Sequence, residues 1–194
     1  YADAGLFPRD LFVENQHLRH LLAAPDDGVE RTHRLLADEA DLAAANLLRR
    51  DGVEIDYATH GPDDGVPLLL IMGLGMQRTA WPETLIDALV RQGFRCISFD
   101  NRDIGLSTRY DEHGVPPLHR VIAARLLRRP YRLPYTLADI ADDGMAVLDA
   151  LGIERAHVLG ISMGGMIAQH LAARHAARVT SLTLMSTSSG RLGL

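Results

Sequence analysis

The chain has 194 residues, of which 47% are hydrophobic and 23% charged, and its formal net charge is −5 at pH 7. These values are typical of a globular protein large enough for a sizeable core. All 20 basic residues are arginine, which excludes sites built on lysine such as P-loops, Schiff bases and Ser–Lys dyads. The negative charge argues against a nucleic-acid partner, and no apolar run is long enough for a membrane span.

Residues 1–50 differ in pattern from the rest of the chain. Their apolar residues recur at mixed three- and four-residue spacing over 11–24 and 29–50, with a turn at 25–28 between them. We therefore expect a helical N-terminal extension over 1–50 and a separately patterned core over 51–194.

From residue 51 the pattern changes to alternating strands and helices. Strands are predicted at 53–58, 67–72, 94–99, 156–159 and 179–185, and helices at 81–92, 135–151 and 165–173. Continuous apolar runs among them are typical of strands buried on both faces of a parallel sheet. The order predicts a doubly wound, mostly parallel α/β sheet, in which active groups lie at the carboxyl ends of the strands.

The segment Gly160-Ile161-Ser162-Met163-Gly164 lies between a predicted strand and a predicted helix. Gly-x-Ser-x-Gly in this setting is typical of a nucleophile elbow, a strained turn that exposes a serine hydroxyl. Glycines two residues to either side remove side chains that would collide there. Ser162 is therefore the predicted nucleophile, against the alternative that the pattern is an ordinary glycine-rich turn.

Two backbone N–H groups are candidates for an oxyanion hole. Met163 directly follows the serine at the start of the helix, and Leu74 lies between Gly73 and Gly75 in the loop after the strand at 67–72. The glycines leave the backbone free to turn the Leu74 amide inward. A plain tight turn is the alternative, whereas a nucleotide fingerprint is disfavoured because Arg78 replaces its third glycine.

Taken together, these motifs resemble the α/β-hydrolase superfamily over residues 51–190, and most closely an aclacinomycin-methylesterase-like group of serine esterases and lactonases. Segment 68–75 looks like the oxyanion strand and loop of that family, with Met72 where many members have histidine. Segment 99–108 is similar to its Asp-x-Arg-Gly-x-Gly-x-Ser pattern, with Asp103 in place of the first glycine. The doubly wound sheet is accordingly expected to be of the α/β-hydrolase type, incomplete at its C-terminal end.

The resemblance implies hydrolysis of a small-molecule carboxylic ester or lactone through an acyl-serine intermediate, with no cofactor and no metal. The resemblance implies that Asp100, Asp103 and Arg102 shape a loop beside the substrate pocket. Gly73 and Gly75 are expected in the loops at the same pocket. Arg102 is expected to pair with a nearby carboxylate or to cap nearby carbonyls. An acyltransferase or a cofactor-free peroxidase on the same fold is the alternative within this class.

The resemblance places the acid and the histidine of a catalytic triad beyond Leu194, so we expect a partial chain that is inactive alone. His170 lies about 12 Å along its helix from Ser162, and His157 about 16 Å down the strand, so neither is within hydrogen-bond reach. A loop could bring His113 or His119 closer, but this is a weaker hypothesis.

A non-catalytic binding protein built on half of a hydrolase fold is the other hypothesis. Residues 1–50 and an open sheet edge would then mediate association with a partner or with a second copy. The single cysteine, Cys96, is predicted to be a buried structural thiol. A single cysteine, which allows no internal disulfide, and the lack of a signal-peptide pattern favour a cytoplasmic location.

Overall fold

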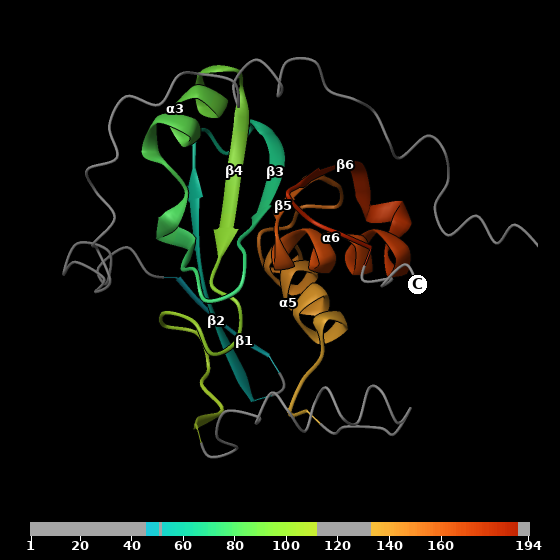
Figure 1. Ribbon diagram of the computed structural model, residues 1–194. Helices are drawn as coiled ribbons and strands as arrows, with labels where there is room; N and C mark the ends of the chain where they lie inside the picture. Colours follow the sequence, from blue (N-terminus) through green and yellow to red (C-terminus); the bar gives the residue numbers. More distant parts are fainter. Residues whose placement is uncertain (1–45, 51, 112–132, 190–194) are drawn as a thin grey trace, which may run out of the picture.

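The computed structural model describes residues 46–50, 52–111 and 133–189, which form one sheet flanked by helices (Figure 1). Six strands make up the sheet in the order β1-β2-β4-β3-β5-β6. Their bounds are β1 Asn46–Arg50, β2 Val53–His60, β3 Val66–Ile71, β4 Phe94–Phe99, β5 Ala156–Ile161 and β6 Val179–Met185. β1 and β2 are antiparallel to their neighbours, whereas β4, β3, β5 and β6 run parallel.

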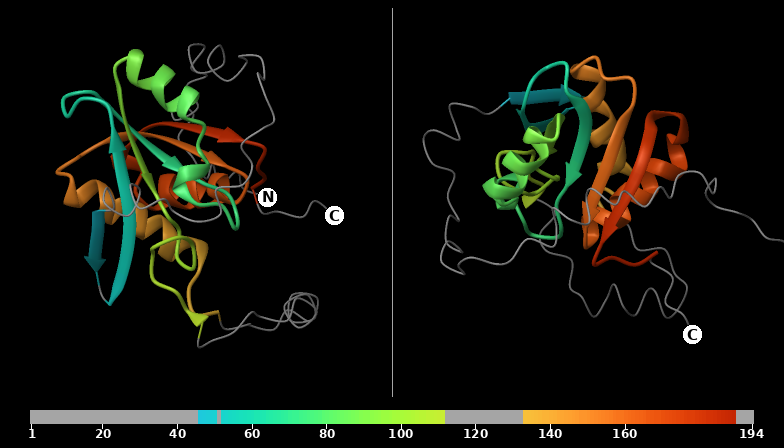
Figure 2. Two further views of the ribbon diagram at one scale, coloured as in Figure 1. Left: turned by 90° about the vertical axis from the view of Figure 1, so that its left-hand side faces the viewer. Right: turned by 90° about the horizontal axis from the view of Figure 1, so that it is seen from above.

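Helices cover both faces of this sheet, as Figure 2 shows, with α3 (Glu83–Arg91) on one side and α5 (Leu137–Ala150) and α6 (Met163–Arg174) on the other. Two short 3-10 helices, η2 (Arg78–Ala80) and η4 (Ala176–Arg178), lie in the connections. None of the α-helices in the described ranges is long and apolar enough to cross a membrane.

The central strand β3 packs against both helical layers through alternate side chains. Leu68 and Leu70 belong to the apolar cluster on the α3 side, which includes Leu89. Leu69 and Ile71 belong to the larger cluster on the side of α5 and α6. Successive side chains of a strand point to opposite faces, so a continuous apolar run is what a strand covered on both sides requires. The prediction of a doubly wound, mostly parallel sheet is confirmed.

The predicted core elements agree with the structure to within a few residues at their ends. The helix α3 begins at Glu83, two residues later than the predicted start at Trp81. The reason is local, because Pro82 forms the N-cap and Trp81 is buried before the helix. Gly93 and Gly152 have positive φ angles of 87° and 67° directly after α3 and α5, as expected of helix-terminating glycines.

The helix predicted over 29–50 is wrong at its C-terminal end. Residues 46–50 form β1, which pairs antiparallel with residues 53–57 of β2. In this pairing Leu48 lies opposite Ile55 and contacts the main apolar cluster. A short strand that adds to an existing sheet edge gains ladder hydrogen bonds that periodicity in the sequence does not reveal. The rest of the predicted helical extension, residues 1–45, lies outside the described residues.

A capping box fixes the start of α5. The Thr136 hydroxyl accepts a hydrogen bond from the Asp139 N–H, and the Asp139 carboxylate accepts one from the Thr136 N–H at 2.7 Å. Hydrogen bonds from the side chain and backbone of Thr136 lower the pKa of Asp139. Reciprocal bonds of this kind satisfy donors that the first turn of a helix leaves open.

Replacing Thr136 by Ala should lower the free energy of unfolding by about 1 kcal/mol, because an exposed N-cap acceptor is lost without loss of packing. The measurement is urea unfolding at pH 7, with Thr136→Ser as the matched control that retains the hydroxyl. Asp139 has a folded-state pKa below its unfolded value, so its contribution is present above the ordinary Asp range and is lost as pH falls through the lowered pKa. The difference in unfolding free energy between wild type and Thr136→Ala should therefore become smaller in acid, where Asp139 is protonated, while the part due to the lost acceptor for the Asp139 N–H remains. A difference that does not change with pH would contradict a contribution from the Asp139 carboxylate.

Candidate active site

Three loops meet at the carboxyl end of the parallel strands. Ile71 of β3 lies opposite Gly160 of β5, so the residues that follow each strand are neighbours. A Cβ built on Gly73 would lie 3.3 Å from Ser162 Cβ and 3.8 Å from its Oγ. The loop after β4 joins them, because Asn101 Nδ2 donates to the Met72 carbonyl at 3.2 Å. The sequence features singled out at these strand ends are thus brought together.

Ser162 occupies a strained turn between β5 and α6. Its φ is +54° and its ψ is −121°, a conformation that non-glycine residues rarely adopt. Its N–H donates to the Met185 carbonyl at 2.9 Å and its carbonyl accepts from the Gly165 N–H at 3.0 Å, so the turn is held on both sides. The serine itself is exposed. Strain at an exposed polar residue is characteristic of functional sites.

Backbone contacts explain why glycines flank this serine. A Cβ on Gly160 would lie 2.3 Å from the Gly164 carbonyl oxygen, and one on Gly164 would lie 2.1 Å from the Ile71 oxygen. No side-chain rotation relieves contacts of this kind, because both partners are backbone atoms. The first turn of α6 therefore rests directly on the ends of β3 and β5, which places Ser162 beside the loop after β3.

Two backbone N–H groups near Ser162 have no hydrogen-bond acceptor among the described residues. Met163 is the first residue of α6, so its N–H has no intrahelical acceptor. Residues 73–76 form a tight turn in which the Met76 N–H donates to the Gly73 carbonyl at 3.3 Å. Gly75 has a φ of +73°, as the third position of a type II turn requires. That turn leaves the N–H of Leu74 without a role, and the Leu74 side chain is 76% exposed.

Asp100 and Arg102 make structural contacts in the loop after β4. Asp100 is 3% exposed and its carboxylate accepts from the Arg78 backbone N–H. Burial raises the pKa of Asp100. Arg102 binds Asp143 of α5 through two hydrogen bonds, at 2.7 and 2.8 Å, which confirms the expected carboxylate partner.

Asp103 has a φ of +66°, which is the left-handed conformation that a glycine adopts without strain. Its carboxylate compensates for this backbone strain, since it accepts hydrogen bonds from the Tyr110 N–H at 2.6 Å and from the Tyr135 hydroxyl. The rings of Tyr110 and Tyr135 lie 5.2 Å apart. Asp103 therefore joins the two chain segments that precede and follow residues 112–132.

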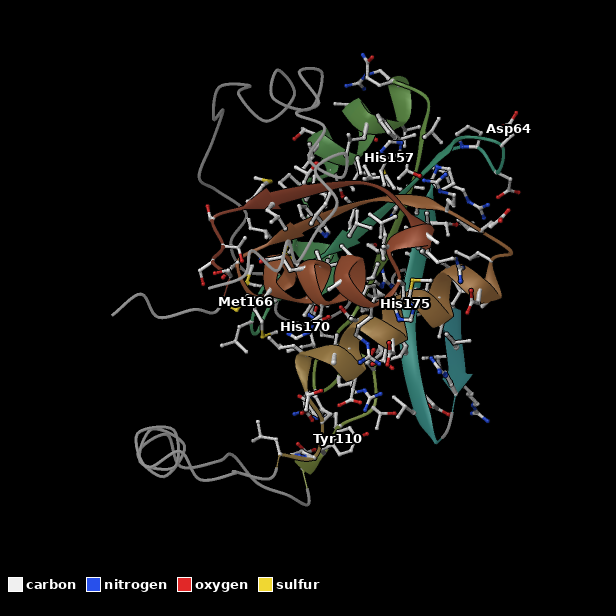
Figure 3. All side chains as sticks on the ribbon, turned by 90° about the vertical axis from the view of Figure 1, so that its right-hand side faces the viewer. Asp64, Tyr110, His157, Met166, His170 and His175 are labelled. Atoms are coloured by element: carbon white, nitrogen blue, oxygen red, sulfur yellow. The ribbon has the colours of Figure 1, made fainter. Side chains whose placement is uncertain are left out.

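No histidine within the described ranges hydrogen-bonds the Ser162 hydroxyl. His157 Nδ1 lies 2.6 Å from Ser181 Oγ, and its ring meets Phe94 edge-on. Figure 3 shows His157 on the α3 side of the sheet, whereas His170 and His175 lie with α6 on the opposite side. His175 Nε2 is bound to Asp142 at 2.8 Å. His113 and His119 lie outside the described residues.

Other candidate sites are weak in the part of the chain that the structure describes. No group of three or more His, Cys, Asp or Glu side chains there is placed to hold a metal ion. Cys96 is fully buried, and desolvation raises its pKa to about 11, so it is an unreactive thiol at neutral pH. Two polar hollows lie away from Ser162 and are lined by charged residues of α5 and its neighbours, among them Arg50, Asp142 and His175.

A buried ion pair beneath the loop after β3 was not predicted from the sequence. Arg78 Nε lies 2.6 Å from Asp56 Oδ2, and the two side chains are 8% and 1% exposed. Asp56 lies in a segment whose alternating pattern predicts a half-buried strand, and the sequence marks Arg78 only as the residue in place of the third glycine of a nucleotide fingerprint. No regular spacing links two residues 22 positions apart on different elements, so no sequence signal could have paired them.

The chain is similar to proteins of one known family. The family described as alpha/beta hydrolase fold matches residues 66–192. Rhodomycin D methylesterase DauP from Streptomyces sp. strain C5 is 34% identical over 139 residues, which cover 72% of this chain and 41% of the methylesterase. Among solved structures, a hydrolase from Pseudomonas aeruginosa is similar with a TM-score of 0.60 and 33% identity, over 77% of this chain and 48% of the other. The enol-lactonase from Burkholderia xenovorans is similar with a TM-score of 0.58 and 27% identity, over 74% and 47%.

Replacing Gly164 by Ala tests the backbone contact at the start of α6. Helix propensity alone favours Ala over Gly by about 1 kcal/mol, but the new methyl group would overlap the end of β3. We therefore expect a net loss of about 3 kcal/mol in the free energy of unfolding. Urea unfolding provides the measurement.

Gly152→Ala is the matched control, because Gly152 has nothing within 4 Å of a new Cβ and suffers only from its φ of +67°. Its expected cost is about 1–2 kcal/mol. An unchanged or raised stability of the Gly164 variant would show that α6 does not rest on β3 as described.

Proposed function

The chain belongs to the α/β-hydrolase fold family, and from this premise we propose that Ser162 is the nucleophile of an enzyme that hydrolyses a carboxylic ester or lactone. The aligned part of the chain spans less than half the length of the methylesterase it resembles. The proposed reaction is therefore that of the whole protein, to which the described residues contribute the nucleophile and the oxyanion hole.

The strained, exposed conformation of Ser162 at the N-terminus of α6 is the observation that carries this proposal. A hydroxyl in that position is open to a substrate carbonyl, and the positive end of the helix lies beside the atom where charge develops. Attack, with transfer of the Ser162 proton to the base, would give a tetrahedral oxyanion. Its collapse breaks the ester C–O bond and gives an acyl-serine, while the base returns the proton to the leaving oxygen, which departs as the alcohol of an ester or stays attached to the opened chain of a lactone. Water then attacks the acyl carbonyl, and collapse of the second oxyanion releases the carboxylic acid and restores the Ser162 hydroxyl.

The proposed oxyanion hole consists of the N–H groups of Met163 and Leu74. Support comes from the turn at residues 73–76, which leaves the Leu74 amide unused, and from the contact between Gly73 and Ser162. Removal of a single oxyanion donor typically lowers kcat about 10²–10³-fold. The two amides belong to different loops, so the hole depends on the relative placement of β3 and β5.

The general base is proposed to come from outside the described residues. A serine hydroxyl needs a base within about 2.6–3.2 Å to lose its proton. Among the described histidines, His157 and His175 hydrogen-bond other side chains. His170 lies on α6 about 12 Å along the helix from Ser162, and His60 pairs with Cys96 toward the amino end of β4. Asp100, Asp103 and Arg102 are assigned to loop structure, since each carboxylate or guanidinium has a partner in the fold.

The substrate class is inferred from the elbow and from the names of similar proteins, one a methylesterase and another an enol-lactonase. Methyl esters and enol-lactones are both acyl compounds, which a nucleophile attacks at the carbonyl carbon. The proposed reaction requires neither a metal nor an organic cofactor, because serine attack and oxyanion stabilisation use protein groups alone.

A fluorophosphonate probe tests the nucleophile directly. We expect a single covalent adduct on the protein, seen as an increase in intact mass, and its complete loss in Ser162→Ala. Ser186→Ala is the matched control, because Ser186 is also exposed and has a φ of +46° but does not begin a helix. Equal labelling of wild type and Ser162→Ala, or loss of labelling only in Ser186→Ala, would refute the assignment.

A further inference from the structure

We propose that Arg78 and Asp56 are positioning residues whose buried ion pair holds the turn at residues 73–76 in the geometry that the oxyanion hole requires. The inference rests on the function proposed above, since it assigns a role in the same site. It adds two side chains that do not touch the reacting atoms but act through the backbone of Leu74.

The turn at residues 73–76 has little packing of its own. The side chains of Leu74 and Met76 are 76% and 48% exposed, so burial contributes little to holding the turn. Its internal hydrogen bond, from the Met76 N–H to the Gly73 carbonyl, is long at 3.3 Å. The position of the Leu74 amide therefore depends on how the two ends of the loop are fixed.

The first end of the loop is fixed by the sheet. Ile71 is paired with Phe99 of β4 on one side and with Gly160 of β5 on the other. Asn101 then donates to the Met72 carbonyl at 3.2 Å. The backbone thus leaves the sheet in a defined direction immediately before Gly73.

The second end of the loop is fixed at Arg78 by two carboxylates. The Arg78 backbone N–H donates to Asp100 Oδ1, and the side-chain Nε donates to Asp56 Oδ2 at 2.6 Å. Asp56 belongs to β2 and Asp100 follows β4, and these strands are themselves joined where the Asp100 N–H donates to the Asp56 carbonyl at 2.8 Å. Arg78 is consequently anchored to both neighbouring strands at once.

Burial makes this anchor strong and directional. In the described part of the chain, Arg78 Nε is the only hydrogen-bond donor to the Asp56 carboxylate, whose Oδ1 is buried without a partner. Moving Arg78 would leave a charge that is 1% exposed without compensation, which is strongly unfavourable. The ion pair therefore opposes displacement of the loop in a way that an apolar contact, which has no preferred direction, does not.

The test compares wild type with the double variant Arg78→Met and Asp56→Leu, because replacing both charges by apolar side chains of similar size is often neutral for stability. Amide hydrogen exchange over residues 73–78 should become about 10-fold faster or more in the double variant. The second-order rate of fluorophosphonate labelling of Ser162 should fall about 10–100-fold, as expected for a misplaced oxyanion donor.

Arg178→Met is the matched control. Arg178 also binds a carboxylate and a carbonyl, Asp149 Oδ1 at 2.6 Å and the Ile153 oxygen at 2.9 Å. It differs from Arg78 in its place, because it precedes the edge strand β6 and so lies at the amino end of the parallel strands. Its loss should lower stability without changing exchange at 73–78 or the labelling rate of folded protein. If Arg78 had a purely structural role, hydrogen exchange at residues 73–78 and the labelling rate of folded protein would be unchanged in the double variant, as in Arg178→Met.

Unchanged exchange at residues 73–78 in the double variant would overturn the proposal, as would an equal change in Arg178→Met or wild-type labelling rates in a double variant of normal stability. Failure of the wild-type protein to label at Ser162 would instead refute the proposed function. The exchange measurement would still decide whether the ion pair holds the loop, because it needs no catalysis.

Discussion

The contact between the first turn of α6 and the end of β3 is the constraint on which the rest of the site depends. Backbone atoms of Gly164 and Ile71 approach so closely that a methyl group cannot be placed between them. This approach sets the distance from α6 to the sheet and brings Ser162 beside Gly73. The strained φ of Ser162 follows from the same geometry, because β5 must reverse into a helix that already lies against its neighbour. Packing of Ile167 and Leu171 in the main apolar cluster stabilises that arrangement.

Most of this architecture could be predicted from the sequence because local signals agree with tertiary packing. Strands such as β3 and β4 are continuous apolar runs, and glycines mark the ends of α3 and α5. The elbow could be recognised because its glycines, at positions 160 and 164, satisfy a steric demand that no other residue meets. β1 could not be predicted, since its identity as a strand depends on pairing with β2 rather than on its own pattern. The Arg78–Asp56 pair was missed for a related reason, because it is defined by three-dimensional proximity alone.

Charge is distributed around the site in a consistent way. Four ionic side chains of the loops after β3 and β4 are bound to partners within the fold, namely Arg78, Asp100, Arg102 and Asp103. The exposed side chains of the same loops include the apolar Leu74, Met76 and Leu106. Ionic groups thus stabilise the scaffold, while these three apolar side chains are exposed. The carboxylates of these loops are thus bound within the fold. An unpaired carboxylate beside Ser162 would oppose the negative charge that develops on the oxyanion.

The Asp103 carboxylate, which binds both Tyr110 and Tyr135, has a consequence for the evolution and engineering of the chain. These contacts hold residues 110 and 135 close to each other, so the described part of the chain fixes the two ends of the stretch between them. The entropy of closing a loop rises by only about 0.6 kcal/mol for each doubling of its length. A change in the length of that stretch therefore adds little to the loop-closure entropy. Asp111 and Leu133 are the described residues that border it, and they are the junctions at which a segment of different length would be joined.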